Sequence, residues 1–139
     1  MPLTNYLDQK ACQYYWGLTA YTAVATVYCA LSTTTPVQTG SPNFTEPSGS
    51  AYARVAVTNN TTNFVETTSP PTNGWAQANG TAITFPTATG SWGTCTYFGF
   101  FDASSGGNLL AFGQLTTAQT ISLGGIPAFA IQALTILFN

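Results

Sequence analysis

Short runs of alternating apolar and polar residues cover most of the chain. The most distinct run, Cys95–Phe101, is rich in aromatic and β-branched residues, and Asn108–Gly113 returns after a loop of Asp, Ser and Gly. This pair predicts a β-hairpin inside the aromatic stretch Phe85–Leu115, around which the fold is organised. The same alternation predicts further strands, at Thr26–Thr33, Ala51–Val57, Phe64–Val65, Gly80–Phe85, Gln119–Leu123 and Phe129–Phe138, the last with a bulge near Gln132–Ala133.

One passage, at about residues 3–16, has a helical period instead. Leu7, Tyr14 and Tyr15 fall on one face at steps of three and four residues, and Thr4 stands where a cap would start the helix. Because this face is apolar and aromatic, the helix must lie against something. Two interpretations stay open: the helix packs on its own domain, or it is an arm that docks on a neighbouring subunit.

Two long polar segments, at about residues 34–50 and 58–78, separate the strands and are rich in Pro, Gly, Thr and Asn. Loops of this length are commonly functional, so we expect them to make contacts with a partner. Phe44 is expected to be exposed in the first segment, and Phe64 lies in a short edge strand within the second.

The succession of short strands, preceded by one short helix, shows no βαβ alternation and no repeat. This pattern asks for two packed antiparallel sheets. We therefore expect a single all-β domain over residues 1–139: an antiparallel β-sandwich, jelly-roll-like, with one short N-terminal helix.

Charge is scarce, with two basic residues, four acidic residues and a formal net charge of −2. Basic residues supply most non-specific affinity for nucleic acids, so no nucleic-acid partner is expected. The same shortage argues against a polybasic membrane anchor, and no apolar run approaches the roughly 20 residues of a membrane helix. A chain with so little electrostatic protection against self-association is better suited to a fixed place in an assembly.

Catalytic constellations are not evident. The chain has no histidine, which removes the commonest general base and metal ligand. The spacing of the four carboxylates favours neither a glycosidase-like pair nor a calcium loop, and Asp102 is better explained as a turn residue of the hairpin. We expect no enzyme activity, no catalytic residue, no cofactor and no metal site.

Two further residue types are given structural interpretations. Arg54 is expected to be solvated or to form a salt bridge with Glu46, Glu66 or Asp102. The three cysteines are widely spaced and odd in number, so we expect buried free thiols rather than disulfides.

Aromatic residues near loops are the remaining candidates for function. Trp75 follows a turn and Trp92 is expected at the tip of a connector, where either could stack on a sugar, although core packing or a subunit interface is favoured. The predicted interface comprises the following residues: Leu7, Tyr14, Tyr15, Phe44, Phe64, Trp75 and Trp92.

Several stretches resemble a family of small tailed-bacteriophage proteins that are usually labelled tail-fibre-like. The similarity is carried by Ala20–Tyr28, Ser48–Arg54, Ile83–Thr94, and Phe98–Ala103 followed by Gly106–Leu110. It covers most of the chain from Leu3 to about Gly125. Similar small β-sandwich proteins also serve as capsid cement or decoration proteins. The resemblance implies a structural role in the virion and transfers no catalytic residue.

These observations lead to one main hypothesis and two alternatives. The main hypothesis is a capsid cement or decoration protein, a homotrimer on the outer capsid surface that binds the major capsid protein and bridges its subunits. Asp8 and Lys10 fall where a signal peptide would be apolar, so synthesis in the host bacterial cytoplasm is expected. The alternatives are a tail or tail-fibre component and, in another class, a carbohydrate-binding module.

Overall fold

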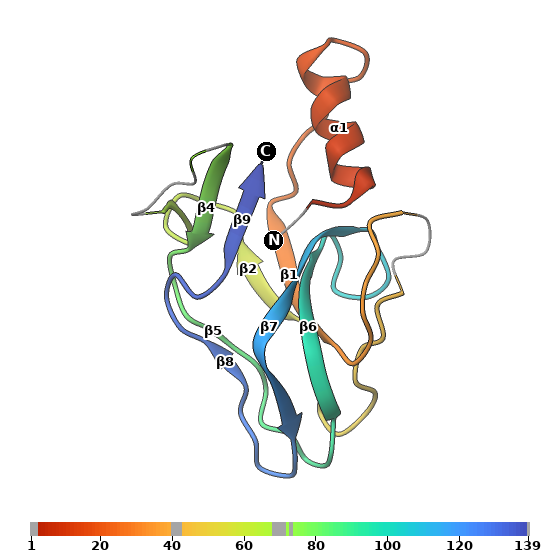
Figure 1. The fold of residues 1–139 in the computed structure, drawn as a ribbon, viewed down its shortest axis with the longest axis vertical. Coiled ribbons are helices and arrows are strands. Elements are labelled where there is room, and N and C mark those ends of the chain that lie inside the picture. The colour runs from red at the N-terminus through yellow and green to blue at the C-terminus, as the bar shows by residue number, and fades with distance from the viewer. Residues whose placement is uncertain (1–2, 40–42, 68–71, 73, 139) are drawn as a thin grey trace.

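A four-stranded antiparallel sheet, ordered β2-β1-β6-β7, forms the centre of the structure (Figure 1). Its strands span Thr26–Ser32 (β1), Val55–Thr58 (β2), Gly93–Phe101 (β6) and Leu109–Ile121 (β7). This computed structural model describes residues 3–39, 43–67, 72 and 74–138. The predicted central hairpin is confirmed as the β6–β7 pair.

Two smaller antiparallel sheets pack against the inner face of the central sheet. One has the order β3-β4-β9, with strands at Phe64–Glu66, Trp75–Asn79 and Thr135–Phe138, and the other pairs β5 (Ile83–Thr84) with β8 (Ala128–Phe129). Together with α1 (Asn5–Tyr15), the one helix among the described residues, at one end, these sheets confirm the predicted all-β, sandwich-like fold.

The main core fills the space between these layers. Phe98 and Phe100 project from β6, where Phe98 contacts Phe129 at a ring-centroid distance of 5.3 Å and Phe100 contacts Phe64 at 5.9 Å. Cys29 and Cys95 fill small buried positions of the same core. Burial raises the pKa of the Cys95 thiol to about 11 and also raises that of Cys29, because a thiolate is poorly solvated there. The third cysteine, Cys12, is exposed, so the expectation of burial is wrong for that residue.

The central sheet is covered on its outer face as well. Phe101 and Phe112 lie in a second buried cluster there, and Phe44, from the segment before β2, meets Phe101 edge-on at 5.1 Å. Gly99 makes this approach feasible, since a Cβ at Gly99 would lie 2.8 Å from the Phe44 ring. The prediction that Phe44 is exposed is therefore wrong, because the residue-34–50 segment folds back onto the sheet.

Strand β7 runs without interruption where the sequence pattern predicts two strands. Cys95 pairs with Gln119 and Tyr97 pairs with Gln114, so two steps along β6 face five along β7. The three extra residues form a bulge, which restores the pairing on either side. The polar run Gln114–Gln119 hides this continuity, because its side chains lie at the sheet edge and do not alternate in burial.

The predicted final strand, Phe129–Phe138, is divided instead into β8 and β9. Gln132 has a positive φ of 60°, and the buried Asn79 side chain accepts from the Leu134 N–H and donates to the Ala130 carbonyl, both at 2.8 Å. These bonds hold a turn at the place where the sequence predicts a bulge. Asn79 also ends β4, a strand that lies inside the predicted loop of residues 58–78.

Two other predicted strands are shorter than expected. The strand predicted from Ala51 begins only at Val55, because Ser50 and Ala51 have positive φ angles of 51° and 64°. The strand predicted over Gly80–Phe85 is reduced to β5.

Arg54 closes the outer face with its charge buried. The side chain of Arg54 is 7% exposed, its Nε lies 3.0 Å from Glu46 Oε1, and its Nη1 donates to the carbonyls of Ala103 at 2.7 Å and Gly106 at 2.8 Å. Its guanidinium carbon also lies 3.7 Å from the centroid of the Phe101 ring. The predicted ion pair is confirmed with Glu46 as the partner, and it ties the first long segment to the β6–β7 turn.

Replacing Arg54 should therefore destabilise the whole sandwich. We expect Arg54→Ala to lower the free energy of unfolding by about 3 kcal/mol, because it leaves a partly buried carboxylate and two carbonyls without their partner. Urea denaturation measures this change. The control, Glu66→Gln at the exposed end of β3, should change stability by less than about 0.5 kcal/mol. Equal stability of the two variants would contradict the role of the ion pair.

Candidate functional site

Helix α1 is fixed to the sandwich mainly at its start. The Thr4 hydroxyl donates to the carbonyls of Leu109, at 2.5 Å, and Leu110, at 3.1 Å, and the Gln38 side chain donates to the Leu3 carbonyl at 3.0 Å. Thr4 precedes the helix as predicted, but its hydroxyl makes no capping bond because it is engaged with β7. No residue of the helix itself is buried, and the helix stands at one end of the sandwich (Figure 1).

The end of the helix presents large apolar side chains to solvent. Tyr15 is 80% exposed, Trp16 is 79% exposed and Leu18 is 75% exposed. Tyr14 and Tyr15 meet edge-to-face with their ring centroids 5.5 Å apart. Their own domain gives these side chains little to pack against, which favours the interpretation of α1 as a docking arm.

The inner face of the β3-β4-β9 sheet continues this apolar surface. Phe64 is buried in the core and Ile136 is half-buried, but farther along the same face Phe138 and its cross-strand partner Trp75 are exposed. A cavity of about 460 Å³ separates this face from α1. We call this cavity the helix groove; its apolar lining includes Leu7, Tyr14, Tyr15, Phe64, Ile136 and Phe138.

Three exposed aromatic side chains line the helix groove, and two more are near them: Trp16 follows Tyr15 in the chain, and Trp75 pairs with Phe138 across the strands. We call these five side chains the aromatic surface: Tyr14, Tyr15, Trp16, Trp75 and Phe138. At about 200 Å² for a whole aromatic side chain, their exposed parts amount to about 600 Å². The largest apolar patch of a typical monomer is about 300–600 Å². Several exposed aromatic side chains around one groove are typical of a site that contacts another molecule.

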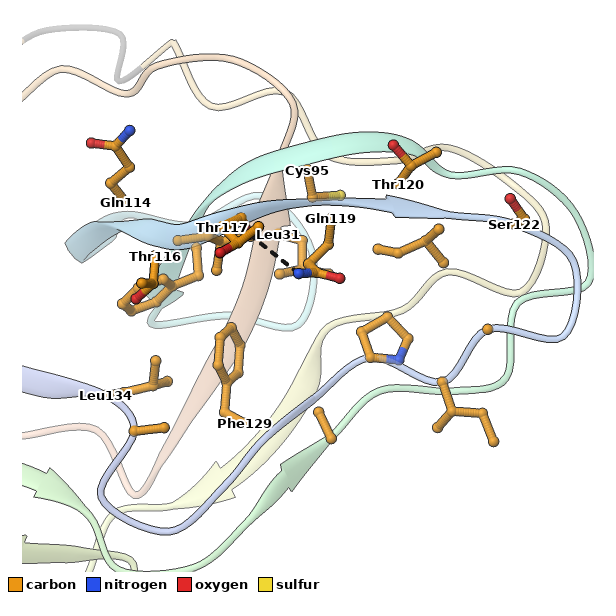
Figure 2. A pocket seen from close by; sticks show the side chains of 18 residues that line it. Leu31, Cys95, Gln114, Thr116, Thr117, Gln119, Thr120, Ser122, Phe129 and Leu134 are labelled. Atoms are coloured by element: carbon orange, nitrogen blue, oxygen red, sulfur yellow. Dashed lines mark hydrogen bonds between the residues drawn. The ribbon is translucent and has the colours of Figure 1, made fainter.

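A second cavity, of about 600 Å³, lies between β7 and the segment that contains β8. We call it the β7 cleft. Figure 2 shows Phe129 and Leu134 on the side opposite β7, with Gln119 and Thr116 along the strand. No charged side chain lines it. The cleft offers an apolar floor with uncharged polar groups at its rim.

The seven predicted interface residues lie in three kinds of place: at the helix groove, in the main core and, for Phe44, half-buried against Phe101 on the outer face. Leu7, Tyr14, Tyr15 and Trp75 lie at or beside the helix groove, and their contact with a partner stays a prediction.

Trp92 is wrong as an interface residue, because it belongs to the main core. Phe64 belongs to the same core but also lines the helix groove, so its contact with a partner stays a prediction. Trp92 is 3% exposed, and its indole N–H donates to the Ser50 carbonyl at 2.9 Å. This burial also excludes Trp92 as a platform for a sugar. The pattern missed Trp16 and Phe138 because each lies at the end of its element, where periodicity cannot separate an inward from an outward position.

All six charged residues lie in the described part of the chain, and three of them are engaged in structure. Glu46 is paired with Arg54, and both carboxylate oxygens of Asp102 accept from Asn108, at 2.6 and 2.8 Å. Asp102 is thereby confirmed as a turn residue. Among the described residues, no group of three or more His, Cys, Asp or Glu side chains could hold a metal ion. Within the same ranges, no helix is both long and apolar enough to cross a membrane.

A comparison with protein families decides the class of the molecule. A family model described as podophage GP4 fiber I protein gp80 matches residues 2–137. The chain belongs to this family. It is therefore a structural component of a bacteriophage virion, and the resemblance to tail-fibre-like phage proteins is confirmed.

Membership of this fibre family also bears on the choice between the functional hypotheses. It fits the tail or tail-fibre alternative better than the prediction of capsid cement. No curated protein matches the chain. Family membership places the protein in the virion, but it does not place it on the outer capsid surface.

The two tryptophans Trp75 and Trp92 should respond very differently to truncation. We expect Trp92→Ala to lower the free energy of unfolding by about 3–5 kcal/mol, since it empties a packed core position. Trp75→Ala, its matched control on the exposed sheet end, should lower it by about 0.5 kcal/mol or less. Urea denaturation followed by far-UV circular dichroism measures both. A tolerated Trp92→Ala would contradict its assignment to the core.

Proposed function

We propose that the chain is a structural subunit of a bacteriophage fibre, with a mechanical and not a catalytic role. The observation that carries this proposal is the match to a fiber I family over residues 2–137, which spans nearly the whole chain. A protein similar to fibre proteins over its full domain is best explained as a fibre component itself.

The aromatic surface supplies a means of assembly. Its exposed area of about 600 Å² approaches the roughly 800 Å² that each partner buries in a standard protein interface. Burial of this surface yields hydrophobic stabilisation with little penalty for desolvating charges, since none of its side chains is charged. We propose that neighbouring fibre polypeptides, further copies of this chain included, cover it. The two partners predicted from the sequence, further copies in a homotrimer and the major capsid protein, stay predictions.

Repetition turns modest contacts into a stable fibre. Each subunit needs only one moderate interface, because a tethered neighbour binds at a high effective concentration. The structural role is also supported by the engagement of Glu46 and Asp102 within the fold. A carboxylate fixed by an arginine or by a turn is poorly placed to act as a general base.

Location on the particle tests the fibre assignment. Gold-labelled antibodies against this chain should mark fibres near the tail in electron micrographs of purified virions, at far fewer sites than the copies of a shell protein. Antibodies against the major capsid protein provide the control, because they mark the head evenly. Even labelling of the head by both antibodies would overturn the fibre proposal in favour of capsid cement.

Incorporation into particles tests the aromatic surface. We expect the double variant Tyr15→Ser/Trp16→Ser to fold normally but to be incorporated into virions at least tenfold less, a loss equivalent to about 1.4 kcal/mol. Quantitative immunoblots of purified particles measure incorporation. Leu123→Ser, which removes an equally exposed apolar side chain from the turn after β7, serves as the matched control. Equal incorporation of both variants would contradict assembly through the aromatic surface.

A further inference from the structure

Strand β7 forms an outer edge of the central sheet and is unusually open to pairing. It is the last strand in the order β2-β1-β6-β7 and runs for 13 residues. Edge strands normally carry charges or proline that block the addition of another strand. From Leu109 to Ile121 the chain has neither. The protection of β7 consists of two irregularities in the pairing with β6, at Leu110 and at residues 115–118.

The chain itself already uses the beginning of this edge. Leu3 forms an antiparallel bridge with Ala111, and the Thr4 N–H donates to the Leu110 carbonyl at 2.9 Å. The backbone of Leu110 thus faces outward from the sheet. Because the direction of backbone groups alternates along a strand, Gln114 also faces outward, beyond the part that Leu3 and Thr4 cover. The edge demonstrably accepts extended backbone.

Beyond that point, the edge is left without a strand partner. In the described ranges 3–39, 43–67, 72 and 74–138, no segment other than β6 pairs with Gln114–Thr120. Within this stretch, the Gln119 side chain donates a long hydrogen bond of 3.4 Å to the Thr117 carbonyl. The N–H and C=O groups that point away from β6, on either side of the bulge, are therefore open to a further strand.

The β7 cleft lies directly beside this free edge. Gln119, Thr116 and Thr117 line it from the strand, and Phe129 faces them across the gap (Figure 2). Side chains of an added strand alternate between its two faces, so every second one would enter this cleft. The apolar floor favours apolar side chains, and the uncharged rim offers nothing to pair with a charge.

We propose that an extended, uncharged segment of another virion polypeptide adds to β7 as a further strand. Its backbone bonds the outward groups of Gln114–Thr120, and its alternate apolar side chains occupy the β7 cleft. The site is separate from the helix groove and goes beyond assembly through the aromatic surface. A neutral saccharide would suit the polar rim, but it lacks the regular alternation of donors and acceptors that a strand edge matches.

Hydrogen exchange on the full-length chain tests this inference. Mass spectrometry should show the amides between Phe112 and Ser122 exchanging at least tenfold more slowly in purified particles than in the free protein. Equal exchange in the two states would overturn the proposal. Protection of this peptide in the free chain by an oligosaccharide at millimolar concentration, without protection in particles, would assign the cleft to a sugar and overturn it as well.

A pair of variants separates backbone pairing from contact through side chains. Gln114→Pro removes one outward N–H, a change that an edge strand tolerates, whereas Gln114→Thr keeps it. We expect both free proteins to fold alike by circular dichroism, with the proline variant incorporated into particles at least tenfold less. Equal incorporation would overturn the proposal. If the proline variant fails to fold, the comparison of exchange in the wild-type chain decides.

Gold labelling and hydrogen exchange together distinguish this inference from the fibre assignment. Gold labelling on the head with a protected β7 edge would refute the fibre assignment alone. Labelling on fibres with an unprotected edge would refute strand addition alone.

Discussion

The burial of the β6–β7 hairpin on both faces is the constraint on which the rest of the structure depends. Phe98 and Phe100 need a cover on the inner side, and Phe101 and Phe112 need one on the outer side. The two small sheets supply the first cover. The segment around Phe44 supplies the second, and the Arg54–Glu46 pair fastens it. Segments that resemble free loops in the sequence are therefore parts of the packing.

Two parts of the sheets are left uncovered by the rest of the chain, and we propose functions for both. The inner face of the β3-β4-β9 sheet extends past the core, which leaves Phe138 and Trp75 exposed opposite α1. The bulged half of β7 extends past the short contact with Leu3. A subunit of an assembly differs from an isolated globule in this respect, because part of its packing is completed by neighbours.

The sequence predicted the elements better than it predicted their surroundings. Alternation identified β1 and β6, since local periodicity reflects which side of a strand is buried. It favoured the core or a subunit interface for Trp92 but could not choose between them, because the choice depends on a distant bond to Ser50. For the same reason it placed Phe64 and Phe44 at the surface. Tyr14, Tyr15 and Trp75, which it named as interface residues, are exposed, because each lies where its element leaves the sandwich.

The burial of Arg54 weakens the electrostatic field around the molecule. The chain has two basic residues, and the charge of Arg54 is neutralised by Glu46 inside the fold, so Lys10 is the remaining basic side chain. The long-range field around the molecule is then weak, and encounters with other chains are governed by diffusion and tethering, without electrostatic guidance. Salt screens interactions between charges, and few of these remain. The strength of the contacts between subunits should therefore depend little on ionic strength.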